Sequence, residues 1–167
     1  MRAWTPAAAA LLGAILPATP AAAQTLPVSS WTTYSDQNTG TRVDFPEGLF
    51  VPAGAPERGP GRRFRTPDGR AEFSIYTVNS ARGETPRSYL QNNLKVPRRV
   101  LDYERVTKQF FAVSSLYQGR VYYSRCNFAP DASAPMHCIY LAYPAREKRA
   151  WDAVVTRISL SLRPRHG

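Results

Sequence analysis

Two acidic residues, Asp102 and Glu104, have the spacing that an acid/base pair would need. Residues two apart in an extended segment point to the same side, and one carboxylate beside another can have its pKa raised enough to act as a general acid. Arginines stand close by at positions 98, 99 and 105, so surface ion pairs explain the two carboxylates more simply. A carboxylate-dependent hydrolase is therefore the less favoured alternative, and the sequence indicates no catalytic residue.

Metal binding and thiol chemistry would depend on Cys126, His137 and Cys138. A structural zinc site needs its ligands to converge on one ion. His137 directly precedes Cys138, and adjacent residues of a strand point to opposite faces, so these three side chains do not converge. The remaining histidine, His166, is next to last in the chain, where order is usually poor. We expect no metal site.

Motifs for the common cofactors and nucleophiles are absent from the sequence. It contains no G-x-S-x-G, no H-E-x-x-H and no G-x-x-x-x-G-K-[ST]. The segment Gly59-Pro60-Gly61 begins like a dinucleotide-binding loop but lacks the third glycine and the preceding strand. We therefore expect no cofactor.

A cluster of arginines, Arg62, Arg63, Arg65 and Arg70, surrounds one predicted hairpin. In a strand Arg63 and Arg65 point the same way, and Arg70 lies close to them across the turn. Guanidinium groups arranged in this way can bind a phosphate or a carboxylate through paired hydrogen bonds. The cluster is the candidate anion-binding site, and the simpler alternative is a solvated basic face that confers solubility.

The first 23 residues have the pattern of a secretory signal peptide. Arg2 precedes an apolar run over 7–16, and Ala21-Ala22-Ala23 offers a cleavage site. A run of this length crosses only about half of a ~30 Å hydrocarbon core, which makes a membrane anchor the weaker alternative. We expect a mature chain, 24–167, that forms a single domain in the periplasm or outside the cell, with 24–30 as a loose leader.

The charge of the chain is strongly positive, with 22 basic and 12 acidic residues and a formal net charge of +10. Such an excess favours anionic partners. An exported domain meets lipopolysaccharide phosphates, acidic lipids and anionic polysaccharides, whereas it does not meet nucleic acid. We expect an anionic envelope component or another periplasmic protein as the partner, no nucleic acid, and no transmembrane segment in the mature chain.

The two cysteines fall in a predicted hairpin whose strands cover 120–126 and 137–143. If that hairpin is centred on Ala132, Cys126 and Cys138 lie directly opposite each other, at a separation that a disulfide can bridge. Export would place both in an oxidising compartment. A disulfide is expected, with two buried free thiols as the alternative.

Alternating apolar and polar residues predict the other strands. Two strands flank the turn at Asn38-Thr39-Gly40, and a hairpin turns at Pro67-Asp68-Gly69. The expected strands cover 31–34, 41–45, 49–51, 62–66, 70–78, 103–107 and 110–116.

Two helices are expected. Thr85 and Pro86 provide a cap and a first residue for a short helix that ends before Pro97. Near the C-terminus Trp151, Val154, Val155, Ile158 and Leu162 form one apolar stripe, which predicts an amphipathic helix that packs on the sheet and ends at Pro164. Its basic polar side leaves binding to a membrane surface as the alternative.

This order of elements resembles the Mog1/PsbP-like fold, an α+β fold in which helices flank an antiparallel sheet. Several segments also resemble a group of small exported alphaproteobacterial proteins of unassigned function. These segments are 40–46, 64–71, 140–144, 151–152 and 157–162. The resemblance covers nearly the whole mature chain.

The resemblance implies a binding or accessory role. The extrinsic photosystem subunit and the Ran-binding Mog1 protein, which share the wider fold, are binding or accessory proteins and not enzymes. No binding motif of either maps residue by residue onto this sequence, and a shared fold does not by itself transmit function. We therefore expect a non-catalytic periplasmic binding or accessory protein, with an envelope-associated protein that binds polyanions or anionic lipids as the alternative.

Overall fold

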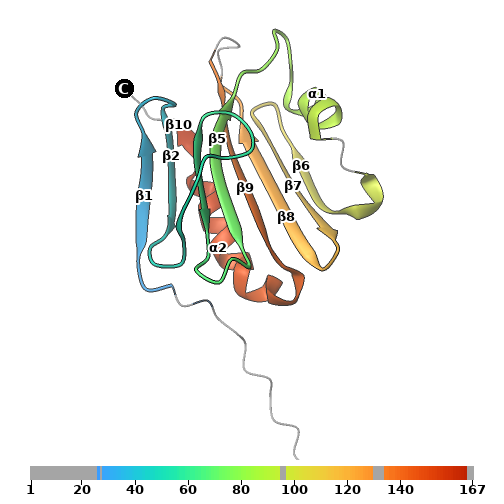
Figure 1. Ribbon diagram of the computed structural model, residues 1–167. Helices are drawn as coiled ribbons and strands as arrows, with labels where there is room; N and C mark the ends of the chain where they lie inside the picture. Colours follow the sequence, from blue (N-terminus) through green and yellow to red (C-terminus); the bar gives the residue numbers. More distant parts are fainter. Residues whose placement is uncertain (1–25, 27, 95–96, 130–133, 165–167) are drawn as a thin grey trace, which may run out of the picture.

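The computed structural model describes residues 26, 28–94, 97–129 and 134–164, and the expected signal peptide lies outside these residues. The described part contains strands that form two sheets, and helices that flank them (Figure 1). The strands are β1 (Trp31–Asp36), β2 (Thr41–Pro46), β3 (Val51–Gly54), β4 (Gly61–Arg65), β5 (Glu72–Val78), β6 (Leu101–Val106), β7 (Phe110–Tyr117), β8 (Arg120–Asn127), β9 (Met136–Pro144) and β10 (Arg163–Pro164). The helical elements are α1 (Pro86–Tyr89), η1 (Leu90–Leu94), η2 (Arg98–Val100), η3 (Ala145–Glu147) and α2 (Lys148–Ser161).

The larger sheet has seven antiparallel strands in the order β3-β4-β5-β9-β8-β7-β6. Strand β9 is central, although it comes last along the chain, and it pairs with β5 on one side and β8 on the other. The smaller sheet has the order β1-β2-β10. The predicted α+β class with an antiparallel sheet flanked by helices is confirmed.

One face of the large sheet is covered by α2 and the small sheet, as Figure 1 shows with α2 behind β5 and β9. Alternation along β5 and β9 places apolar side chains on this face, where they pack against α2 and β2 to form the main core. The core includes Val43, Phe64, Phe73, Ile75, Val121, Ile139, Leu141, Trp151, Val154, Val155 and Ile158. On the other face α1 and η1 pack at one end on a second cluster around Phe111 and Met136, and the loop between β3 and β4 lies against β5.

Helix α2 has the predicted apolar stripe, with Trp151, Val154 and Ile158 buried. The packing of the C-terminal helix on the sheet is confirmed. The helix ends at Ser161, earlier than predicted, because Arg163 and Pro164 pair with β2 as strand β10. Proline can occupy such a two-residue edge strand because no described strand lies on the outer side to accept a hydrogen bond from a backbone N–H.

The short helix begins as predicted at Thr85. Its side chain accepts a hydrogen bond from the Ser88 backbone N–H, the Ser88 hydroxyl accepts one from Thr85, and Pro86 occupies the first turn. This capping box fixes the start of a helix that is otherwise too short to be stable alone. Tyr89 then packs on Phe111 with ring centroids 5.8 Å apart, so tertiary contacts hold α1 on the sheet.

Two segments differ from expectation. The expected loose leader is partly packed, because Leu26 and Val28 contact the main core and Ser30 donates a hydrogen bond to Glu47. The strand expected at 49–51 begins at Val51 instead, since Leu49 and Phe50 are buried in the core in the turn and the connection before it.

The cysteine register is confirmed: Cys126 lies opposite Cys138, and a disulfide joins them. Both residues are buried under α1 in the second apolar cluster. The bridge ties the central strand β9 to β8 at the end of the hairpin, next to the connection at 130–133, which lies outside the described residues.

His137 points away from the cysteines, as alternation predicts. It is buried on the covered face, where its Nδ1 lies 2.8 Å from the Thr41 hydroxyl of β2. This hydrogen bond joins the two sheets. No helix among the described residues is both long and apolar enough to cross a membrane.

Removal of the disulfide should lower stability with little change in fold. In the chain-entropy account, a cross-link that closes a loop of about a dozen residues contributes on the order of 3 kcal/mol. We expect the Cys126→Ser/Cys138→Ser variant to lose about that much in urea unfolding and to keep its far-UV circular dichroism spectrum. Reduction of the wild-type protein should produce a similar loss, and equal stability of oxidised and reduced protein would contradict the prediction.

Burial lowers the pKa of His137 below its usual value. The unfolded chain therefore binds a proton at His137 at higher pH than the folded protein does. The contribution of neutral His137 to stability is complete above about pH 6.5, and it is lost as the pH falls through the lowered pKa of the folded state. The free energy of unfolding should fall more steeply between about pH 7 and pH 5 in the wild type than in His137→Gln. Parallel pH profiles of the two proteins would count against this assignment.

Candidate functional site

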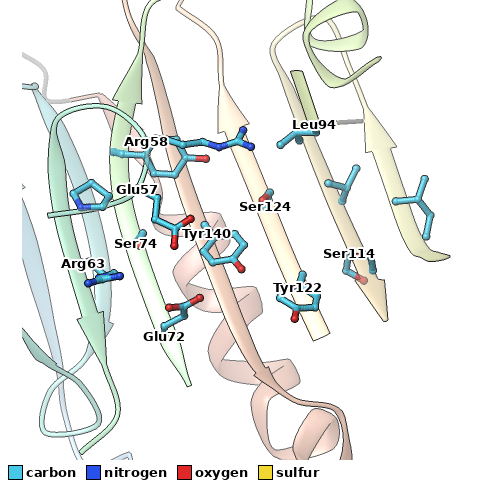
Figure 2. A pocket seen from close by; sticks show the side chains of 15 residues that line it. Glu57, Arg58, Arg63, Glu72, Ser74, Leu94, Ser114, Tyr122, Ser124 and Tyr140 are labelled. Atoms are coloured by element: carbon cyan, nitrogen blue, oxygen red, sulfur yellow. The ribbon is translucent and has the colours of Figure 1, made fainter. Parts of the chain in front are cut away.

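A pocket of about 290 Å³ lies on the face of the large sheet that α2 does not cover. Figure 2 shows its side chains rising from the central strands and from the segment between β3 and β4. The residues on which the argument depends are Glu57, Arg58, Glu72, Tyr122, Ser124, Tyr140, Leu94, Leu101 and Val113. We call this the open-face pocket.

The floor of the pocket is a row of residues set by strand register. Ser74 of β5 lies opposite Tyr140 of β9, Tyr140 lies opposite Ser124 of β8, and Ser124 lies opposite Val113 of β7. Opposed residues of an antiparallel pair share a face, so one row crosses four strands. The serines are small, which leaves room above the sheet between the larger side chains.

One wall comes from the loop between β3 and β4, which carries Glu57 and Arg58. The loop lies against β5: the Thr77 N–H donates to the Pro60 carbonyl at 3.0 Å. Gly59, with φ +62°, approaches so closely that a Cβ there would meet the Thr77 carbonyl oxygen at 2.0 Å. Only glycine fits this position, and the close contact fixes where Glu57 and Arg58 stand.

Tyr140 is the centre of the polar side. In Figure 2 the carboxylates of Glu57 and Glu72 both lie beside it, on the same side of its ring. Burial raises the pKa of Tyr140, and the negative charges of Glu72 and Glu57 and the nearby Tyr122 add to this shift, while Arg120 opposes it. The hydroxyl therefore stays protonated at neutral pH and can donate a hydrogen bond.

The two arginines of the pocket have other neighbours. The Arg63 guanidinium donates to the Ala53 carbonyl at 3.3 and 3.4 Å. Arg58 lies near the hydroxyls of Tyr76 and Tyr89 and lowers the pKa of each, although burial has the larger effect and raises the pKa of Tyr76 to about 12. Both arginines line the pocket, and neither forms an ion pair with Glu57 or Glu72.

The opposite wall is apolar. Leu94 from η1, Leu101 from β6 and Val113 from β7 line it. The pocket therefore has a polar side over β5 and β9 and a hydrocarbon side over β7 and β6. Such a division suits a small ligand that has a polar head and an apolar body.

The predicted arginine cluster is divided by the structure. Arg63 enters the open-face pocket, and Arg62 approaches Tyr34 of β1, whose pKa it lowers against the larger effect of burial. Arg70 forms ion pairs with Asp68 and with Glu147 at the start of α2. Arg65 is exposed, opposite Glu72 on β5. The four guanidinium groups do not converge on one point.

The predicted carboxylate pair is also separated. The register of β6 shifts between Leu101 and Tyr103, which is the irregularity of a β-bulge. Glu104 pairs with Arg87 of α1 at 3.6 Å, whereas Asp102 lines a groove beside α2 on the covered face. The prediction that the two share a face is wrong, because the bulge breaks the simple alternation on which it depended.

The described residues contain no group of three or more His, Cys, Asp or Glu side chains that could hold a metal ion. The groove beside α2 has a volume of about 690 Å³, and its basic side chains include Arg105 and Arg125. Their guanidinium carbons lie 5.5 and 4.2 Å from the centre of the Phe110 ring. Burial lowers the pKa of Arg125, which donates to Asn127 and Ser159.

Sequence reasoning missed the open-face pocket because the tyrosines of β8 and β9 have the pattern of core residues. The available signal was a hydroxyl residue near the centre of each of three neighbouring strands: Ser74, Ser124 and Tyr140. That signal depends on the register of strands far apart in the sequence, which was predicted only for β8 and β9.

No family model matches the chain, and a search of characterised protein sequences finds no match. Solved structures do match. The solution structure of cyanobacterial PsbP (CyanoP) from Synechocystis sp. PCC 6803 has a TM-score of 0.59 and 11% identity, over 87% of this chain and 98% of that one. The Ran-binding protein Mog1p of Saccharomyces cerevisiae has a TM-score of 0.58 and 9% identity, over 81% of this chain and 96% of that one. At such identities the comparison shows the fold alone, and the chain has a Mog1/PsbP-like fold.

Proposed function

We propose that this protein is an exported, non-catalytic binding protein, and that the open-face pocket is its ligand site. The observation that carries the proposal is the pocket itself, with a floor fixed by strand register and two walls of different chemistry. A pocket that is already formed before the ligand arrives reduces the cost of association. The similarity in fold to a Ran-binding protein supports a binding role in general and does not suggest the ligand.

Export is supported by the signal-peptide pattern at 1–23 and by the disulfide between Cys126 and Cys138. Disulfides form and persist in oxidising compartments and are rare in the cytosol. A non-catalytic role is supported by the separation of Asp102 from Glu104 and by the engagement of both cysteines in the bridge.

Filling the pocket should abolish ligand binding. Ser124 lies at the centre of the floor, and a phenylalanine there would occupy the space between Val113 and Tyr140. Small organic cations, anions and neutral compounds should be screened by thermal shift against the mature protein. A ligand at one hundred times its Kd stabilises the folded state by about 2.7 kcal/mol, and this shift should be lost in Ser124→Phe.

Ser35→Phe is the matched control, because Ser35 is an exposed strand residue of β1 outside the pocket. The control should keep the ligand-dependent shift, and mass spectrometry should recover the ligand chemically unchanged. Hits that stabilise Ser124→Phe as strongly as the wild type would overturn the assignment of the site, and conversion of the ligand to a product would overturn the non-catalytic role.

The groove beside α2 supports a second candidate function, the binding of an anionic envelope component. The guanidinium groups of Arg105 and Arg125 lie over the ring of Phe110. Neither forms an ion pair with a carboxylate in the part of the chain that the structure describes. Arg125 is partly buried whereas Arg105 is exposed, and Asp102 and Asp152 also line the groove without pairing with either. A partly desolvated guanidinium without an ion pair favours a phosphate or carboxylate beside it.

Sedimentation with vesicles tests this second function. Vesicles rich in anionic lipid should carry down the wild type, whereas neutral vesicles should not. Arg105→Gln/Arg125→Gln should lower the vesicle-binding constant roughly 30-fold, because each charge near the surface contributes about 1 kcal/mol. The control Arg62→Gln/Arg65→Gln removes the same charge from two exposed positions of β4. Equal losses in both variants would show that net charge alone attracts the protein and would exclude a site in the groove.

A further inference from the structure

We infer that the open-face pocket takes an organic cation, an amine with a small apolar body. This inference rests on the proposed ligand site and names the class of molecule that fits it. Its starting point is the pair of carboxylates, Glu57 and Glu72, that lie beside Tyr140 in the pocket (Figure 2).

Most other described carboxylates are engaged within the chain: five form ion pairs, and Asp36, Glu47 and Glu84 accept hydrogen bonds from neutral groups. Ion pairs join Asp68 and Glu147 to Arg70, Glu104 to Arg87, Asp152 to Lys148 and Asp44 to Arg163. Among the described residues, Glu57 and Glu72 form no such pair. A chain with a formal charge of +10 thus leaves two acidic groups beside one pocket for a cation from outside.

The guanidinium groups of Arg58 and Arg63 also line the pocket, but neither forms an ion pair with Glu57 or Glu72. Arg63 is held by the Ala53 carbonyl, and Arg58 stands near the hydroxyls of Tyr76 and Tyr89. Arg65 lies opposite Glu72 in the β4–β5 register, yet the two form no ion pair. Arg120 acts on Tyr140 more weakly than the two glutamates do.

Aromatic rings supply a second attraction for a cation. The rings of Tyr122 and Tyr140 lie 6.5 Å apart and are tilted by 31°, so both border the same space above the sheet. A positive charge over such rings is stabilised by their negative faces, and the effect grows when water is excluded. An ammonium group near Tyr140 would meet both carboxylates and these rings.

The apolar wall sets the rest of the ligand. Leu94, Leu101 and Val113 would cover a hydrocarbon chain or a ring that extends away from the ammonium group. The volume of about 290 Å³ is at the lower end for ligand pockets, which favours a small molecule over a drug-sized one. The ligand class is therefore a small alkyl or arylalkyl amine.

Isothermal titration calorimetry with matched probes tests the inference. The cationic probes are butylamine, phenethylamine and benzyltrimethylammonium; phenethyl alcohol and hydrocinnamate serve as the neutral and anionic counterparts. At least one amine should bind the mature protein, and phenethylamine should bind at least tenfold more tightly than phenethyl alcohol or hydrocinnamate.

Glu57→Gln and Glu72→Gln remove each charge while keeping the side-chain shape. Each should weaken amine binding about tenfold, whereas Glu47→Gln, a matched change at an exposed residue after β2, should leave it unaltered. Thermal unfolding of every variant checks that the fold is kept. If no amine binds, or if the binding is insensitive to both pocket variants, the cation assignment is overturned.

The two proposals fail in different ways. If hydrocinnamate or phenethyl alcohol binds most tightly and Ser124→Phe abolishes its binding, the pocket is a ligand site but its ligand is not a cation. If the Ser124→Phe change weakens the binding of no compound in the screen, the assignment of the ligand site is wrong, and the cation inference fails with it.

Discussion

The antiparallel pairing of β9 between β5 and β8 is the constraint on which the rest of the structure depends. Because side chains alternate along a strand, a slip of one residue would exchange its two faces. Ile139 and Leu141 would then leave the main core, and Tyr140 would leave the open-face pocket. The disulfide between Cys126 and Cys138 joins β9 to β8 in the observed register, and the hydrogen bond between His137 and Thr41 joins β9 to the small sheet.

The two faces of the large sheet are covered unequally, and this inequality creates the pocket. Helix α2 and β2 together bury the side chains of β4, β5 and β9 on one face, which satisfies the need for a core. On the other face α1 and η1 are too short to reach beyond the end near Phe111, and the loop that holds Glu57 closes one edge. The middle of that face keeps polar side chains because no helix packs there.

Much of the fold could be predicted from local patterns, since each pattern has a direct physical meaning. The apolar stripe of α2, the cap at Thr85 and the opposition of Cys126 and Cys138 all follow from spacing within one element or one hairpin. The failures occurred where distant or irregular contacts decide the outcome. The bulge in β6 separated Asp102 from Glu104, and the pairing of Arg163 with β2 ended α2 early. The pocket required the register of four strands and the position of a loop that depends on Gly59, none of which is visible in a single segment.

Charge has a different meaning at the scale of the chain and at the scale of the site. A net charge of +10 describes the surface as a whole, and it suggests anionic partners. Inside a pocket the nearest few groups dominate, because water that would screen them is partly excluded. Around Tyr140 the negative charges of Glu72 and Glu57 raise the pKa of the hydroxyl more than the positive charge of Arg120 lowers it. A protein that is basic overall can therefore offer a locally acidic site, and its long-range field then repels cationic ligands while the pocket attracts them. Binding of an amine would accordingly strengthen as salt screens the surface field, which is the opposite of the salt dependence of an anion held in the groove beside α2.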